Sequence, residues 1–134
     1  MEYTEQKLTI EELQDFENKL DTKLPESYKE FILENNGGIP EKRYFGDYAI
    51  SRFFSIKYGE DGGKIEYVKR VLGNAIPKEF LPMADDEGGW LFCLSLAEDT
   101  YGQIYFCPLD RNEVELIANS FEEFLGGLTE EEED

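Results

Sequence analysis

The spacing of the apolar residues changes near residue 44, and this change constrains the fold more than any other feature of the chain. Before residue 44, apolar side chains recur every three or four positions, which is the period of one helix face. After it, short runs of aromatic and β-branched residues between Gly-rich turns are typical of strands. Strands that follow one another through short turns form antiparallel sheets. With 134 residues, the sequence predicts a single-domain α+β fold with a mostly antiparallel (mixed) central sheet and helices packed at one side.

The first part of the chain contains two predicted helices. One begins after Thr9, whose side chain can cap the free N–H groups while Glu12 reaches back to Thr9 in a capping box. Its apolar face would comprise Ile10, Leu13, Phe16 and Leu20. The second helix begins at Pro25, whose missing N–H costs nothing at a helix start, and Gly37 or Gly38 supplies a left-handed stop.

The second part of the chain contains the predicted strands and two further helices. The strands are expected at residues 44–45, 50–56, 80–84, 90–96, 103–107 and 113–118. In segment 90–96, the side chains expected on both faces of the strand are mostly apolar, so we place this strand in the centre of the sheet. A helix is predicted over residues 65–72, closed by Gly73. A last helix is predicted after Ser120, where Glu123 repeats the capping box.

The charge of the chain excludes several kinds of partner. The sequence holds 31 acidic and 13 basic side chains and no histidine, which gives a net charge of −18 at pH 7. Nucleic acids and anionic membranes would repel such a chain, so we expect neither as a partner. Disorder is not expected despite the charge, because 40% of the residues are hydrophobic and 14% are aromatic. The sequence therefore predicts a folded acidic domain.

The composition also excludes several kinds of catalytic centre and metal site. Without histidine the chain cannot form a Ser-His-Asp or Cys-His centre, and two cysteines cannot fill a zinc site. Cys93 and Cys107 are expected to be buried free thiols, which suits a reducing cytoplasm. The first five residues are unlike a signal peptide, and no apolar run approaches the roughly 20 residues of a membrane span. We expect a cytoplasmic protein that is not an enzyme and that needs no cofactor or metal.

Three sequence segments, taken together and in order, form a pattern that can be compared with known protein families. Residues 24–31 read Leu-Pro-Glu-Ser-Tyr-Lys-Glu-Phe and lead into Asn-Asn-Gly-Gly at 35–38. Residues 80–89 carry an acidic, Gly-rich turn, and residues 102–106 and 118–125 supply a closing strand and helix. In this order the segments resemble the SMI1/KNR4-like family, also called the SUKH superfamily. The positions that match its motifs, which we interpret as architectural, are Leu24, Pro25, Tyr28, Phe31, Gly37, Gly38, Pro82, Gly88 and Gly89.

The resemblance implies a fold and a class of function. It implies an SMI1/KNR4-like (SUKH) α+β domain without catalytic apparatus, which we place at residues 1–128, before an acidic tail at 129–134. Bacterial members of the family resemble immunity proteins that block a cognate secreted toxin, often a nuclease. Fungal members act as interaction modules in cell-wall and stress signalling. We therefore expect an immunity protein for a basic, nuclease-type toxin domain, with a regulatory or scaffold domain without a toxin partner as the alternative.

The acidic turn at residues 85–87 is the strongest candidate in the sequence for a binding, metal or acid–base site. The adjacent carboxylates of Asp85, Asp86 and Glu87 repel one another, which raises the pKa of at least one of them unless a cation arrives. Three interpretations are open: a solvated turn, part of a surface for a basic partner, and a metal or acid–base site. The segment does not continue with the alternating oxygen ligands of a calcium loop.

Four further residues are candidates for partner binding. Trp90 is the single tryptophan, and it belongs either to the edge of the core or to an interface, where tryptophan is enriched. Asp99, Tyr101 and Asp110 lie on predicted loops, where binding residues concentrate. A dense field of carboxylates can imitate a phosphate backbone and so attract a cationic toxin surface.

Overall fold

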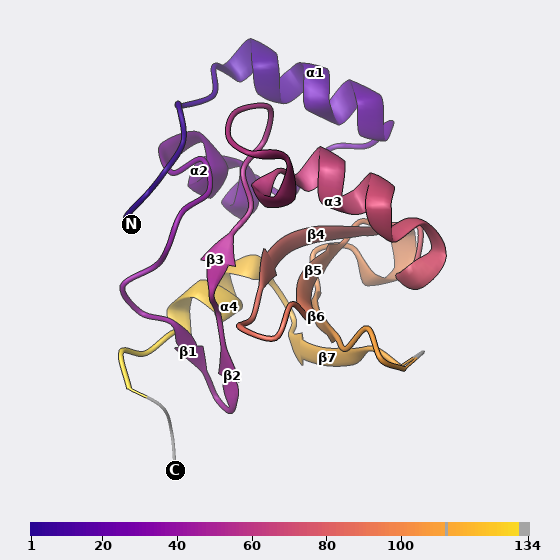
Figure 1. Cartoon of the computed structure of the whole chain (residues 1–134). Helices are drawn as coiled ribbons and strands as arrows, with labels where there is room; N and C mark the ends of the chain where they lie inside the picture. The colour runs from indigo at the N-terminus through magenta and orange to yellow at the C-terminus, as the bar shows by residue number, and fades with distance from the viewer. Residues whose placement is uncertain (112, 132–134) are drawn as a thin grey trace.

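The computed structural model of the chain describes residues 1–111 and 113–131 (Figure 1). Its main sheet has five antiparallel strands in the order β3-β4-β5-β6-β7. These strands are Arg52–Phe53, Phe80–Asp85, Leu91–Ser95, Ile104–Cys107 and Glu115–Ala118. A separate hairpin pairs β1 (Tyr44–Phe45) with β2 (Tyr48–Ala49). The predicted α+β fold and the central position of β5 are confirmed, and all the strand pairs in the described residues are antiparallel.

The described residues form four α-helices, which are α1 (Ile10–Leu20), α2 (Glu26–Glu34), α3 (Ile65–Leu72) and α4 (Phe121–Gly126). Both hydrogen bonds of the predicted capping box are present at the start of α1. Helix α2 begins one residue later than predicted, with Pro25 in the capping position. Ile10 was wrongly placed on the inner face of α1, since its side chain is 66% exposed. The buried side of α1 runs instead through Leu13, Phe16 and Glu17, which leaves the first turn in solvent.

The expected strand over residues 50–56 is much shorter in the structure. Only Arg52–Phe53 pairs with β4. Ser55 leaves this ladder and forms an isolated parallel bridge with Lys64, ahead of α3. Residues 53–56 are all buried rather than alternately buried and exposed, because the chain here passes between β4 and the segments around it. The aromatic and β-branched residues at 50–56 therefore correctly indicated a buried segment, but the predicted length of the strand was wrong.

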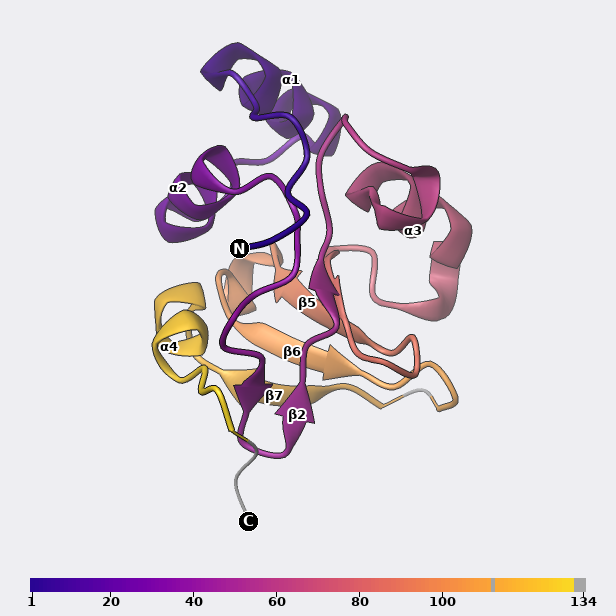
Figure 2. The ribbon, with the colours of Figure 1, turned by 60° about the vertical axis from the view of Figure 1, so that its left-hand side comes forward.

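The core lies between the sheet and the helices that pack on it. Phe92 on β5 packs against Phe124 of α4, and Phe121 of α4 packs edge-on against Tyr28 of α2, with ring centroids 5.9 and 5.1 Å apart. Figure 2 shows α2 and α4 on the left of the molecule and α3 on the right, and in Figure 1 α3 likewise lies on the side away from α2. Cys93 and Cys107 are buried and free, as predicted.

The turn after α2 is held by a buried amide. Asn36 has no exposed surface, its side-chain oxygen accepts the Ile56 N–H at 2.8 Å, and its amide donates to the carbonyls of Gln6 (2.8 Å) and Ile56 (3.0 Å). The following Gly37 has φ +76°, and a Cβ there would lie 3.0 Å from the Cβ of Ser55. Glycine is therefore required at residue 37 both by the backbone conformation and by the space.

The predicted tail begins at a residue that is still tied to the fold. Thr129 and Tyr44 exchange two backbone hydrogen bonds of 2.8 and 3.1 Å, so the chain pairs with the β1–β2 hairpin after α4 ends. Residues 132–134 of the predicted tail lie outside the described residues. The extent of the acidic tail stays a prediction.

Replacing Asn36 by alanine is expected to destabilise the fold by about 3 kcal/mol, because it leaves the buried backbone N–H and C=O of Ile56, and the partly buried carbonyl of Gln6, without this partner. Urea unfolding followed by circular dichroism would measure the loss. The matched control is Asn35→Ala, one residue earlier at a half-buried position, where we expect a change below about 1 kcal/mol. Equal losses for the two variants would contradict the role given to the Asn36 amide.

Candidate functional site

The turn between β4 and β5 is organised by one of the predicted acidic residues. The Oδ1 atom of Asp86 accepts the N–H groups of Gly88 and Trp90, each at 2.9 Å. Gly89 takes a positive φ of 87°, which a residue with a side chain rarely adopts. The Asp86 carboxylate therefore stabilises the shape of the hairpin that carries Trp90.

Asp85 is placed differently, with its side chain only 14% exposed. Its Oδ2 atom accepts a hydrogen bond from Nε of Arg52 at 3.2 Å, whereas its Oδ1 atom is buried without a partner. Burial raises the pKa of Asp85, the neighbouring Asp86 adds to this, and the Arg52 guanidinium opposes it. This mostly covered carboxylate is paired with the half-exposed Arg52, and it is not free to meet a partner.

Glu87 is the member of the acidic turn that faces solvent. Its side chain is 77% exposed and lies 3.2 Å from the guanidinium of Arg43. An exposed ion pair of this kind contributes little to stability, so Arg43 can exchange Glu87 for another anion at small cost. The three carboxylates thus have three environments, and only Glu87 offers its charge at the surface.

Trp90 lies half-buried beside this turn. Its ring packs edge-on against Phe106 with centroids 5.9 Å apart, and the guanidinium of Arg111 lies 5.7 Å from its centroid. Together with the β1–β2 hairpin, it lines an open hollow of about 490 Å³. We call this hollow the hairpin cleft; among its lining residues are Tyr44, Asp47, Tyr48, Glu87, Trp90 and Phe106.

Sequence reasoning missed the contribution of β1 and β2 to the hairpin cleft. Tyr48 stacks on Phe106 with centroids 4.7 Å apart, and its hydroxyl donates to the carboxylate of Glu115 on β7. Burial and this carboxylate raise the pKa of Tyr48 to about 12, so the hydroxyl keeps its proton at neutral pH. The aromatic run at residues 44–48 was visible in the sequence, but nothing in its spacing shows which part of the sheet it would cover.

The register of the sheet divides the remaining predicted residues between two ends. Leu91 pairs with Cys107, so Asp110, which follows β6, lies at the same end as the acidic turn. It is exposed, and its carboxylate lies 3.9 Å from the guanidinium of Arg111. Asp99 and Tyr101 belong to the β5–β6 connection at the opposite end, where the Tyr101 hydroxyl donates to the carbonyl of Lys23. The seven predicted residues therefore do not form one surface.

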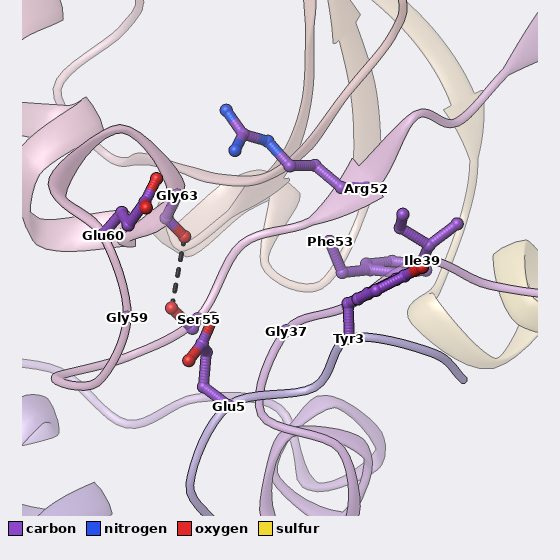
Figure 3. A pocket seen from close by; sticks show the side chains of 11 residues that line it. Tyr3, Glu5, Gly37, Ile39, Arg52, Phe53, Ser55, Gly59, Glu60 and Gly63 are labelled. Carbon is purple, nitrogen blue, oxygen red and sulfur yellow. Dashed lines mark hydrogen bonds between the residues drawn. The ribbon is translucent and has the colours of Figure 1, made fainter.

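A second cleft, of about 460 Å³, lies over the Asn-Gly-Gly turn (Figure 3). Two of its polar side chains are engaged within the chain: Arg52 also donates to the Gly62 carbonyl at 2.9 Å, and Ser55 donates to the Gly63 and Tyr58 carbonyls. A hydroxyl that donates to carbonyls is not activated as a nucleophile, because no base accepts its proton. This cleft holds polar contacts that support the fold around Gly37.

Residues 1–111 and 113–131 also bear on whether the chain holds a metal ion or spans a membrane. Within this part of the chain, no group of three or more His, Cys, Asp or Glu side chains is arranged to hold a metal ion. In the same residues, no helix has the length and apolar character to cross a membrane.

The family of the chain follows from its sequence. The sequence model of the SMI1/KNR4 family (SUKH-1) matches residues 7–127. The chain belongs to the SMI1/KNR4 family. The resemblance drawn from the three segments is thereby confirmed, and membership of the SMI1/KNR4 family supports an immunity-like or other protein-interaction role. Members of this family are generally non-catalytic immunity proteins.

The fold of this SMI1/KNR4 domain also has a solved counterpart. It is similar to the crystal structure of a protein from Pseudomonas syringae pv. tomato, with a TM-score of 0.63 over 96% of this chain and 87% of that one. The two sequences are 15% identical, so the likeness establishes a shared fold. A search of curated protein sequences found no significant match to this chain.

The raised pKa of Asp85 predicts a pH dependence of stability. Between the ordinary pKa of 3.8 and the raised value, the folded state binds more protons at Asp85 than the unfolded state, so this group lowers stability as pH rises through that window. Replacing Asp85 by asparagine removes this titration. We therefore expect the wild-type protein to gain stability relative to Asp85→Asn as the pH is lowered from 7 towards 4, measured by urea unfolding.

The matched control for Asp85→Asn is Asp99→Asn, an exposed residue at the other end of the sheet. Its stability relative to the wild type should stay nearly constant over the same pH range. A wild-type protein that loses stability relative to Asp85→Asn on acidification would contradict burial as the dominant influence on Asp85.

Proposed function

We propose that this SMI1/KNR4 domain is a non-enzymatic immunity protein, which binds and blocks a basic, nuclease-type toxin domain in the cytoplasm. The observation that carries the proposal is the hairpin cleft, where aromatic side chains are flanked by two exposed carboxylates. Trp90, Tyr48 and Phe106 supply the apolar centre, and Asp47 and Glu87 lie on its rim. This arrangement, on a chain of net charge −18, is suited to a cationic partner.

The charge of the chain would act mainly on the rate of association. A nuclease must hold a phosphate backbone, so its binding surface carries Lys and Arg side chains. A field of carboxylates attracts such a surface and can raise association rate constants towards 10⁸–10⁹ M⁻¹s⁻¹ at low salt. Exposed charges are screened by salt, so they supply steering more than they supply lasting affinity.

The affinity would come from the centre of the hairpin cleft. A half-buried tryptophan that a partner covers completely is the kind of residue that dominates binding energies. Arg111 now lies over the Trp90 ring at 5.7 Å, and a cationic side chain of the partner could take its place with the same cation–π contact. Inhibition would follow because the bound domain covers the surface that holds the nucleic acid, and no catalytic step is involved.

Growth rescue tests this proposal. The chain would be co-expressed with candidate toxin domains encoded near its gene, as the wild type, as Trp90→Ala and as the double variant Asp47→Lys/Glu87→Lys. We expect Trp90→Ala to weaken binding about 30-fold, the size of a hot-spot residue, and the double variant to slow association and abolish rescue. Binding rates of the purified pair would be measured by surface plasmon resonance.

The matched control is Asp99→Lys, which reverses one exposed charge at the opposite end of the sheet and should leave rescue intact. Asp85 and Asp86 are unsuitable for charge reversal, because one is in a partly buried ion pair and the other shapes the hairpin. Full rescue by both cleft variants would place the interface elsewhere. If the wild type binds a protein partner but rescues growth from no toxin, the regulatory or scaffold role would replace the proposed one.

A further inference from the structure

The two edges of the main sheet are not equally protected. At the β3 edge, Gly38 and Phe53 exchange two backbone hydrogen bonds of 3.1 and 2.8 Å, and Ile39 continues into a bridge with Glu2. The Asn-Gly-Gly turn and the N-terminal segment therefore cover this edge. Exposed edges attract other strands, and proteins usually cover them in this way.

At the other edge, β7 has no such cover. Within the described residues, the backbone of residues 113–118 makes hydrogen bonds to β6 and to no other segment. Figure 1 shows β7 at the lower border of the sheet. Its outward N–H and C=O groups are thus available to pair with an added strand.

One face of the β7 edge is apolar and incompletely covered. Phe80 on β4 stacks on Tyr105 of β6 with centroids 4.8 Å apart, and Tyr105 lies opposite Leu116 of β7. Exposure rises along this row, from 7% at Phe80 to 51% at Leu116, and Val114 is 40% exposed. The apolar row therefore ends at β7 with side chains that one more strand would cover.

The other face of the β7 edge is acidic. Glu115 lies opposite Phe106, with Glu113 two positions before it, and the Glu113 side chain is 80% exposed. The Glu115 carboxylate accepts the Tyr48 hydroxyl and lies 3.6 Å from the guanidinium of Arg111, which also covers Trp90. The acidic face of β7 is therefore continuous with the hairpin cleft.

We propose that the β7 edge binds an extended, basic segment of a protein partner as an added antiparallel or parallel strand. Apolar side chains of that segment would lie with Val114 and Leu116 on one face of the sheet. Its alternating Lys or Arg side chains would lie with Glu113 and Glu115 on the other face. A second copy of this chain fits less well, because β7 paired with β7 would bring like charges together.

We assign this segment to the toxin domain, and only that assignment rests on the proposed function. The edge, its apolar row and its acidic face are properties of this chain alone. A synthetic peptide can therefore test the edge without any toxin, and its result is separate from that of the rescue experiment.

The probe is a fluorescent peptide of about eight residues in which Lys alternates with Val, a length that matches a typical strand. Two derivatives have the same sequence and charge, one with the Lys amides N-methylated and the other with the Val amides N-methylated. An added edge strand uses only one of its two edges, so one derivative should lose binding at least ten-fold while the other keeps it. Binding would be followed by fluorescence anisotropy in about 0.15 M salt, which screens diffuse attraction to the acidic chain.

Hydrogen exchange and two variants locate the peptide on the protein. The bound peptide should protect backbone amides within residues 113–118 and leave the β5–β6 connection unchanged. Leu116→Lys and Glu115→Lys should each weaken binding about ten-fold, whereas Glu98→Lys, an exposed reversal at the opposite end, should not. Equal binding of both N-methylated derivatives, or protection confined to other segments, would overturn the proposal, even if the toxin experiment succeeds.

Discussion

Three hydrogen bonds made by the buried Asn36 side chain join the N-terminal segment, the turn after α2 and the chain that follows β3. These segments are distant in sequence, and none of them has a regular ladder of its own at this point. The side-chain amide of Asn36 takes the place of such a ladder, because it can donate and accept hydrogen bonds with backbone groups at the same time. With the turn fixed, Gly38 reaches Phe53 and the β3 edge is closed. The closure of the β3 edge therefore depends on this one side chain.

The carboxylates of this acidic chain have more than one role. Asp86 shapes a turn, Glu17 accepts the Leu24 N–H at 2.7 Å in a buried setting, and the mostly covered Asp85 is paired with Arg52. Such carboxylates maintain the structure and are not available to a partner. Those at the hairpin cleft, such as Asp47 and Glu87, are exposed. The position of each carboxylate is therefore more informative about function than the net charge.

The elements that depend on local chemistry were predictable from the sequence. Thr9 with Glu12, and the segment 65–72 closed by Gly73, have the residues that start and end helices, and the structure has these helices at the predicted positions. The composition of the candidate site was partly predictable, but its assembly was not. Asp85, Asp86 and Glu87 are neighbours in sequence, and only the register with β3 and the geometry of the turn separate their roles. Tyr48 and Asp99 required the tertiary arrangement, since one joins the hairpin cleft from another sheet and the other lies at the far end.

The pairing of Thr129 with Tyr44 has a consequence for how the hairpin cleft meets a ligand. Strand β1 is paired with β2 on one side and is bridged to Thr129, beyond α4, on the other, so the β1–β2 hairpin cannot move outward unless the bridge between Tyr44 and Thr129 breaks. The hairpin cleft is then preformed, so little conformational entropy is lost when a partner binds to it. Complex formation should be limited by diffusion and orientation rather than by a slow rearrangement of this chain.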